Sequence, residues 1–311
     1  MVFMSSLFSS YPFVLSEAAI CERLRRDDSI TLHPTLFNTP LIYEPHGAKV
    51  LAGVYHQYID IAREFGVPVV IAAPTWRLDS VRVADAGVPQ SINGDAVEFI
   101  QKVKEDSAYE PVFVTGLLAS KNDCYDPKAA LSASEAEEFH TTQAQELADA
   151  GVDLLTAQTI PAVGEAEGMA RAMIATGRPS VIGFCINRHG QVLDGTPLDE
   201  AINLLDERLD KRLGGAPLGY AVNCSHPSFV PAERMDPRAL SRLLEIAANA
   251  SSIDHGELDQ LEQTLVDDVD EWADAMVRLH RDHGVKILGG CCGTTDQHLR
   301  SICEQVHQIT R

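Results

Sequence analysis

The sequence has few basic residues and no long apolar run. Its 311 residues include 25 Lys and Arg against 45 Asp and Glu, which gives a formal net charge of −20. A surface this acidic disfavours binding to nucleic acid and to anionic membranes, which both attract basic proteins. The apolar stretch 1–15 lacks the basic start and the small-residue cleavage site of a signal peptide, and no later run is long enough to span a bilayer. We therefore expect a cytoplasmic protein without nucleic-acid or membrane partners.

Phosphate-binding glycine loops, linkers and repeats are also missing. No Gly-x-Gly-x-x-Gly or P-loop sequence is present, which argues against a nucleotide-binding open α/β sheet. The seven cysteines are too scattered for a disulfide framework and indicate a reducing compartment. With 45% hydrophobic residues and no Pro-, Gly- or Ser-rich linker, the sequence predicts one domain over residues 1–311.

Strand-like and helix-like segments alternate along the whole chain, which indicates a parallel α/β architecture. We expect a helix with a capping box at Ser134 and Glu137, and further helices over residues 259–283 and 294–308. The seventh strand gives the weakest signal, because residues 245–249 also fit the end of a helix. Eight strand–helix units without a linker predict a single (β/α)8 TIM barrel. The expected strands are 12–17, 67–73, 111–118, 154–160, 180–186, 219–223, 245–249 and 286–288.

Three cysteines follow two of the expected strands. Cys291 and Cys292 come after Gly289 and Gly290 at the end of the eighth strand, and Cys224 follows the sixth. Strands six and eight lie near each other in a closed barrel, so these thiols can converge at its carboxyl-terminal face, where barrel enzymes carry their chemistry. Three thiolates suit a tetrahedral zinc ion with one position left open. Buried structural thiols and a redox-active vicinal pair are alternatives that the spacing alone leaves open.

The motif Gly289-Gly290-Cys291-Cys292-Gly293-Thr294, with Asn223-Cys224 upstream, resembles the signature of the homocysteine S-methyltransferase family. That family includes betaine-, S-methylmethionine- and cobalamin-dependent enzymes. Weaker matches extend the resemblance over nearly the whole chain, at Gly151-Val152-Asp153 and Leu193-Asp194-Gly195-Thr196.

The resemblance implies a zinc enzyme with a small-molecule thiol acceptor and a small methyl donor. The donor would be a sulfonium or quaternary ammonium compound, and homocysteine would become methionine, as in methionine biosynthesis. Cys224, Cys291 and Cys292 would be the zinc ligands. An all-cysteine set donates charge to the bound substrate thiolate and keeps it nucleophilic, so no separate protein base is expected. A homo-oligomer is compatible with the sequence.

The resemblance also implies substrate contacts, and two of them depart from the family pattern. The family's Asp near the first strand aligns with Glu17, and its Glu at the fourth strand aligns with Gln158. In the family these acids help hold the ammonium group of homocysteine, so Gln158 weakens the expectation of an ammonium-bearing acceptor. A barrel with a different thiol acceptor, or with a non-catalytic thiol-binding or regulatory role, is the alternative. The other expected contacts are Asn223, Thr75, Trp76, Gly289 and Gly290, while Asn249 and His226 are weaker candidates.

Overall fold

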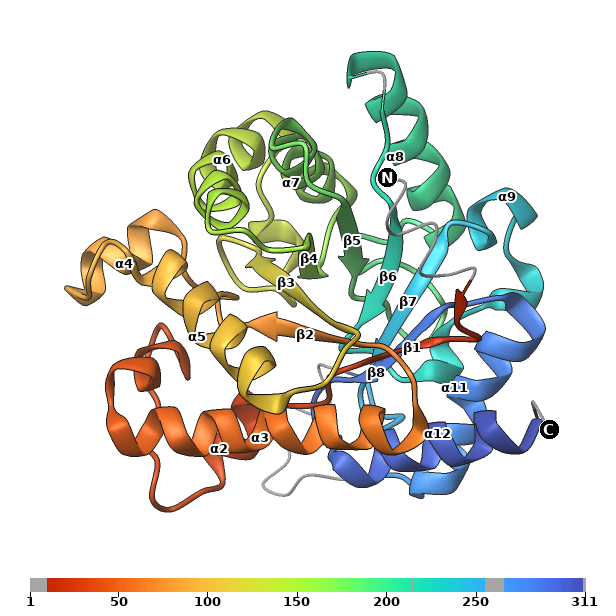
Figure 1. Ribbon diagram of the computed structural model, residues 1–311. Coiled ribbons are helices and arrows are strands. Elements are labelled where there is room, and N and C mark those ends of the chain that lie inside the picture. The colour runs from red at the N-terminus through yellow and green to blue at the C-terminus, as the bar shows by residue number, and fades with distance from the viewer. Residues whose placement is uncertain (1–9, 214, 255–265, 310–311) are drawn as a thin grey trace.

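The computed structural model describes residues 10–213, 215–254 and 266–309. Eight parallel strands close into a barrel in which β1 pairs with both β2 and β8, and helices surround it on the outside (Figure 1). The predicted (β/α)8 barrel is therefore confirmed, including its seventh strand. The strands are β1 Val14–Ser16, β2 Val69–Ala73, β3 Val112–Ala119, β4 Leu154–Ile160, β5 Ser180–Phe184, β6 Gly219–Asn223, β7 Leu243–Ala248 and β8 Ile287–Gly290.

The helices follow the strands in alternation, apart from additional short pieces. They are α2 Cys21–Arg25, α3 Pro45–Phe65, α4 Ser80–Ala86, α5 Ile92–Ser107, α6 Ala133–Asp149, α7 Val163–Ala175, α8 Leu198–Leu213, α9 Pro237–Leu240, α11 Val269–His283 and α12 Asp296–Ile309. The sequence analysis assigned no helix between β2 and β3, where the structure has α4 and α5. Among the described residues, no helix is both long and apolar enough to cross a membrane.

The start of α6 differs from the predicted one. Its capping box is formed by Ser132 and Glu135, so the assignment to Ser134 and Glu137 is wrong by two residues. Both pairs share the same spacing, but only Ser132 has the extended backbone of an N-cap, with ψ 161°. The sequence pattern alone could not separate the two.

The last two helices also start later than predicted. Helix α11 begins after Asp268, whose side chain accepts hydrogen bonds from two backbone N–H groups and caps the helix. Residues 266–268 are therefore outside the helix, and residues 259–265 of the prediction lie outside the described part of the chain. Helix α12 begins at Asp296 because Thr294 is used elsewhere: its hydroxyl donates to the backbone O of Cys291 and accepts from the backbone N of Ala19.

The inside of the barrel is filled by two layers of opposite character. The layer near the amino ends of the strands is an apolar plug with one residue from every strand except β7. Further along the strands, the inward side chains of Ser16, Thr115, Thr156 and Glu245 form a polar floor. The hydroxyl oxygens of Thr115 and Thr156 lie 2.8 Å apart. Because the plug closes the amino end, the pocket above the polar floor opens toward the carboxyl ends of the strands. The plug consists of Val14, Val70, Phe113, Leu154, Val181, Ala221 and Ile287.

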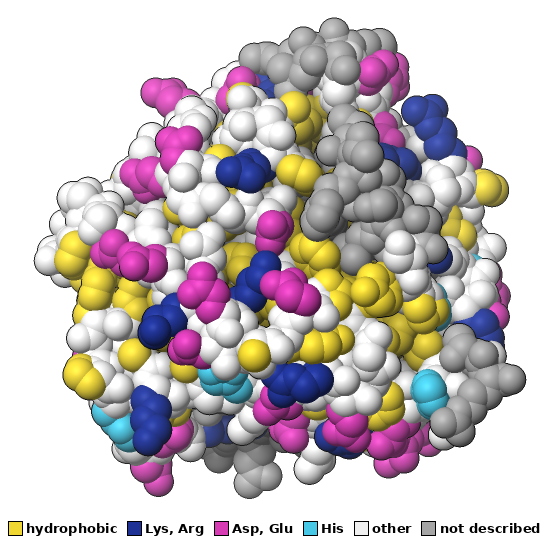
Figure 2. Space-filling model, in the orientation of Figure 1, with side chains coloured by type: hydrophobic (Ala, Val, Ile, Leu, Met, Phe, Trp, Pro, Cys, Tyr) yellow, Lys and Arg dark blue, Asp and Glu magenta, His cyan; other side chains and the backbone are white. Residues whose placement is uncertain are grey.

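The outer surface carries the acidic excess without a concentrated patch on the face shown in Figure 2. Acidic side chains are spread over this face among basic ones. Such a distribution keeps a protein soluble without marking a particular partner.

Close packing of α6 against α7 gives the first testable prediction. A Cβ on Gly168 of α7 would lie 2.6 Å from the Cβ of Ala136 in α6, closer than real carbon atoms approach. We expect Gly168→Ala to lower the free energy of unfolding by about 1–3 kcal/mol, the usual cost of overpacking. Gly53 in α3 is the control, because a Cβ there meets nothing within 4 Å. Gly53→Ala should stabilise the protein by about 0.5–1 kcal/mol through better helix propensity. Urea unfolding measures the free energy of unfolding of both variants. Equal effects of the two substitutions would contradict the packing argument.

Candidate functional site

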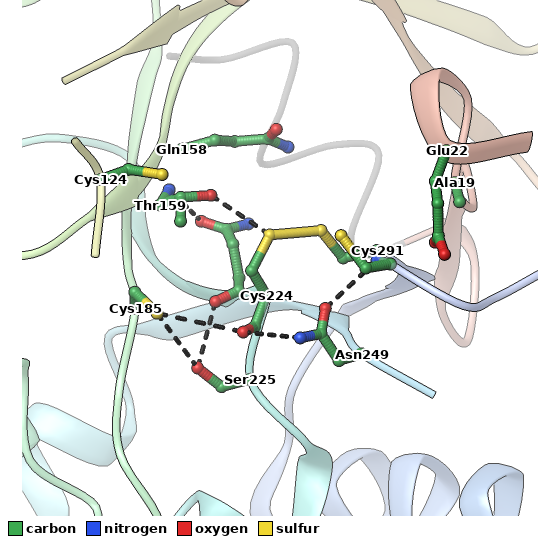
Figure 3. Close-up of a disulfide and its surroundings, with 12 residues drawn as sticks. Ala19, Glu22, Cys124, Gln158, Thr159, Cys185, Cys224, Ser225, Asn249 and Cys291 are labelled. Atoms are coloured by element: carbon green, nitrogen blue, oxygen red, sulfur yellow. Dashed lines mark hydrogen bonds between the residues drawn. A yellow bond between two sulfur atoms is a disulfide. The ribbon is translucent and has the colours of Figure 1, made fainter. Parts of the chain in front are cut away.

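Three cysteine sulfurs meet at the carboxyl ends of β6 and β8, which both pair with β7. The Sγ atoms of Cys224, Cys291 and Cys292 all lie within 4.8 Å of one another. Cys224 and Cys291 are joined by a disulfide (Figure 3), while Cys292 is a free thiol. Once that disulfide is reduced, three thiolates at this spacing form the donor set that soft metal ions select. The cysteines predicted as ligands are therefore close enough to hold one metal ion.

The backbone at Cys224 adopts a conformation that non-glycine residues rarely take. Cys224 has φ 49°, and Thr159 at the end of β4 has φ 61°. Such left-handed residues cost on the order of 1 kcal/mol each and cluster at functional sites. The hydroxyl of Thr159 donates to the Sγ of Cys224 over 3.3 Å, so the two strained residues contact each other. This turn directs the thiol of Cys224 into the pocket.

Asn249, at the end of β7, holds the two cysteine loops together. Its Nδ2 donates to the backbone O of Cys224 over 2.9 Å, and its Oδ1 accepts from the backbone N of Cys292 over 3.2 Å (Figure 3). The indole Nε1 of Trp272 donates to the backbone O of Asn249 over 2.8 Å and fixes it from outside. The sequence analysis gave Asn249 little weight, whereas the structure makes it the residue that positions both loops.

Asn223 faces the pocket with an unused donor. Its Oδ1 accepts from the backbone N of Thr159 over 3.5 Å, whereas its buried Nδ2 has no hydrogen-bond partner among the described residues. Gly183 makes room for it, because a Cβ at Gly183 would lie 2.7 Å from the Cγ of Asn223. An unpartnered buried N–H group is costly, so a substrate oxygen that accepts from it would be stabilised.

Three acids line the pocket: Glu17, Glu22 and Glu245. Glu22 pairs with Arg26 and accepts from the backbone N of Gly293. Glu17, at the end of β1, accepts from the backbone N of Ala72 over 2.7 Å. Burial raises the pKa of Glu17 to about 8. The hydrogen bond from Ala72 partly offsets this increase, and Glu245 adds a smaller one. Burial also raises the pKa of Glu245 to about 7, although the Ser16 hydroxyl lowers it. The sequence analysis missed Glu245; its signal was a single acid inside the otherwise apolar strand Leu243–Ala248.

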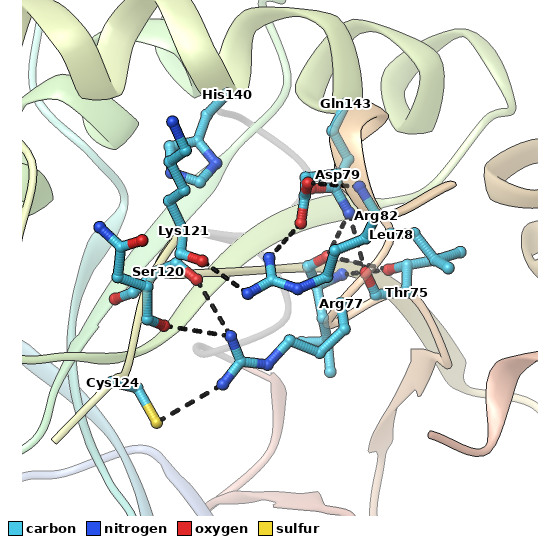
Figure 4. Close-up of polar contacts among 12 residues, drawn as sticks. Thr75, Arg77, Leu78, Asp79, Arg82, Ser120, Lys121, Cys124, His140 and Gln143 are labelled. Atoms are coloured by element: carbon cyan, nitrogen blue, oxygen red, sulfur yellow. Dashed lines mark hydrogen bonds and ion pairs between the residues drawn. The ribbon is translucent and has the colours of Figure 1, made fainter. Parts of the chain in front are cut away.

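Gln158 and Trp76 also line the pocket. The indole Nε1 of Trp76 donates to the backbone O of Gln158 over 3.5 Å. The guanidinium of Arg77 lies 4.4 Å from the ring centroid of Trp76, so this ring already faces a cation of the chain itself. Arg77 also lines the pocket and donates to the backbone O of Ser120 over 3.3 Å (Figure 4). It forms no salt bridge with any described residue.

Thr75 does not line the pocket, contrary to the prediction. It is fully buried, and its hydroxyl both donates to the backbone O of Leu117 and accepts from its N–H, each over 2.9 Å. The side chain of Gln143 donates to the backbone O of Thr75 over 2.8 Å (Figure 4). Thr75 therefore fixes the end of β2 against β3, while its neighbours Pro74 and Trp76 line the pocket.

The two glycines before the cysteines serve different purposes. Gly290 lines the pocket, and a Cβ there would collide with the side chain of Thr294. Gly289 is not part of the lining, because it faces the hydroxyl of Ser16 so closely that no Cβ fits between them. The expected role of Gly289 as a substrate contact is corrected to one in packing β8 against β1.

His226 and the thiols of Cys124 and Cys303 are not members of the sulfur cluster. His226 hydrogen-bonds through Nδ1 to the hydroxyl of Ser228 over 2.7 Å, and its Nε2 lies 3.4 Å from the carboxylate of Asp267. Cys124 and Cys303 are buried thiols outside the cluster.

The fold and the site together define a class: a closed (β/α)8 barrel with a cysteine cluster at one end of its pocket that can hold a metal ion. The family model for homocysteine S-methyltransferase matches residues 15–306, so the chain belongs to the homocysteine S-methyltransferase family.

Individual relatives are distant but extend over much of the chain. Homocysteine S-methyltransferase YbgG of Bacillus subtilis is 24% identical over 95% of each chain. The homocysteine S-methyltransferase of Escherichia coli is 25% identical over 72% of this chain and 74% of its own length. Homocysteine S-methyltransferase 2 of Arabidopsis thaliana is 29% identical over 53% of this chain, and the match spans about half (49%) of that relative.

A solved structure shows the same fold. The homocysteine methyltransferase MmuM from Escherichia coli, in its metallated form, superposes with a TM-score of 0.72 over 97% of this chain and 99% of that chain, at 18% identity.

The buried carboxyl groups make stability depend on pH. The pKa of Glu245 rises from its ordinary value of 4.5 to about 7 on folding. Between these values the unfolded chain has lost a proton that the folded protein still holds, so the free energy of unfolding falls as pH increases through this window. Because the pKa of Glu17 is about 8, the free energy of unfolding continues to fall up to about this pH.

We expect Glu245→Gln to lose part of this dependence. Its Tm should equal that of the wild type near pH 4.5 and exceed it at pH 8, since glutamine has no proton to lose. Calorimetry of the reduced protein at both pH values measures the difference. Glu138→Gln, at an exposed position of α6, is the control and should change neither value. A Glu245→Gln variant with the wild-type pH profile would contradict the argument.

Proposed function

We propose that this chain is a zinc-dependent S-methyltransferase that moves a methyl group from a small donor to a thiol, with homocysteine as the acceptor. The observation that carries the proposal is the approach of three cysteine sulfurs within 4.8 Å at one end of a pocket inside the barrel. Membership of the homocysteine S-methyltransferase family, and the names of the relatives, support the same reaction.

Cys224, Cys291 and Cys292 would hold the metal, and the disulfide between the first two must be reduced before they can do so. Zinc, when bound there, would lower the pKa of the acceptor thiol so that it reacts as a thiolate at neutral pH. Asn249 keeps the two ligand loops at a fixed separation through its two hydrogen bonds. The free Nδ2 of Asn223 and the carboxyl group of Glu17 offer contacts that orient the acceptor.

The wall formed by Trp76 and Arg77 narrows the choice of donor. A sulfonium or quaternary ammonium group is cationic, and the Arg77 guanidinium beside Trp76 repels a donor that carries positive charge alone. A donor that also carries a carboxylate can pair with Arg77 while its methylated cation points toward the sulfur cluster. We therefore favour donors of the betaine or methylated sulfur amino acid type.

A non-catalytic thiol-binding barrel is the second candidate. Gln158 favours it, because the amide stands where the family pattern has an acid. Such a protein would bind metal and thiol but transfer no methyl group.

Methionine formation tests the proposal. Reduced, zinc-loaded protein should form methionine from homocysteine and at least one carboxylate-bearing methyl donor, and tetramethylammonium, which has no carboxylate, should be a poorer donor. Cys291→Ala should lose zinc and at least 100-fold in kcat/KM, as expected when a metal ligand is removed. The matched control is Cys303→Ala, because Cys303 is a buried thiol of α12 outside the cluster. This variant should keep the zinc content and the kcat/KM of the wild type. Full zinc content and activity in Cys291→Ala would rule out the cluster as the metal site.

A further inference from the structure

The polar floor of the pocket contains an acid that the sequence resemblance does not explain. Glu245 lies on β7 with its side chain directed inward, beside the hydroxyl-bearing residues Ser16, Thr115 and Thr156. Barrel interiors are usually filled by branched apolar side chains, and the layer beneath is of that kind here. A carboxyl group at this depth therefore calls for a polar ligand above it.

Three acids line the pocket, and of these Glu17 and Glu245 have no cationic partner among the described residues, whereas Glu22 pairs with Arg26. Glu17 accepts a hydrogen bond from the backbone N of Ala72, and Glu245 is associated with Ser16. No salt bridge to a described residue involves Glu17 or Glu245. Glu245 is buried and Glu17 is half-buried, and both line the same pocket. Two such acids without a counter-charge are costly, and a ligand cation between them would offset that cost.

The distance from the floor to the cysteines fits a short thiol. In the strand register Ala248 pairs with Gly290, the residue before Cys291, and Glu245 lies three residues earlier on the same strand. Three strand residues span about 10 Å, part of which the Glu245 side chain itself covers. In homocysteine four bonds separate the sulfur from the nitrogen, about 5 Å when extended. A sulfur held at the cluster thus leaves the ammonium group within reach of the floor.

We propose that Glu245, together with Glu17, binds the ammonium group of the acceptor, and so provides from β7 the second acid that β4 lacks at Gln158. The inference rests on the proposed function, because it assumes that the acceptor sulfur lies at the cysteine cluster. It makes Glu245 a specificity-determining residue for thiols that carry an amino group. Gln158 then no longer argues against an ammonium-bearing acceptor.

Binding of thioethers that resemble the product tests the role of Glu245 separately from catalysis. Calorimetric titration compares methionine with 4-(methylthio)butanoate, which lacks the amino group; neither ligand has a thiol to titrate. The wild type should prefer methionine, and Glu245→Gln should reduce that preference about ten-fold, because a charge-assisted contact becomes a neutral one. Glu245→Asp keeps the charge on a shorter arm and should retain part of the preference.

A double variant gives the complementary test. Adding Gln158→Glu to Glu245→Gln returns the second acid to β4 and should restore the preference for methionine. The inference would be overturned if Glu245→Gln kept the wild-type preference or weakened the binding of both ligands equally. It would also be overturned if the wild type did not bind methionine. A double variant as poor as Glu245→Gln would also contradict it. If the thioether results hold but no methyl transfer is found with any donor, the proposed function fails while the ammonium site stands.

Discussion

The site depends on the order of the strands in the barrel. Residues 67 positions apart, Cys224 and Cys291, meet only because β6, β7 and β8 lie side by side in the closed sheet. Asn249 then joins the two cysteine loops through one side chain. A metal site built in this way is as rigid as the sheet that carries it, which favours a fixed position for a reacting sulfur.

The interior of the barrel combines an apolar layer, which stabilises the fold, with a polar layer, which costs stability. The apolar plug closes the amino end, so the polar layer above it can be formed without exposing the core. That layer places one acid and three hydroxyl groups where other barrels have aliphatic side chains, and each unpaired polar group there costs free energy. The strained backbone at Cys224 and Thr159 lies at the same end of the barrel. Such costs gathered around one pocket are typical of a binding or catalytic site.

Much of the fold could be predicted from the sequence, because the spacing of apolar residues and the positions of Gly and Pro determine the alternation of strands and helices. The sequence predicted the eight strands and the approach of the three cysteines to one another. Helix starts were less certain, since two overlapping Ser-x-x-Glu patterns around Ser132 look alike until the backbone is known. The inward direction of Glu245, and the burial of Thr75 behind its neighbours, follow from strand register and barrel closure. Neither is encoded in a local pattern.

The central claim is that the three cysteines hold a zinc ion that can accept a substrate thiol. X-ray absorption at the zinc edge tests it most directly, on reduced, zinc-loaded protein with and without homocysteine. The account predicts three sulfur ligands from the protein and a fourth after homocysteine is added, because the donor set leaves one tetrahedral position open. Four protein ligands that do not change when homocysteine is added would contradict it.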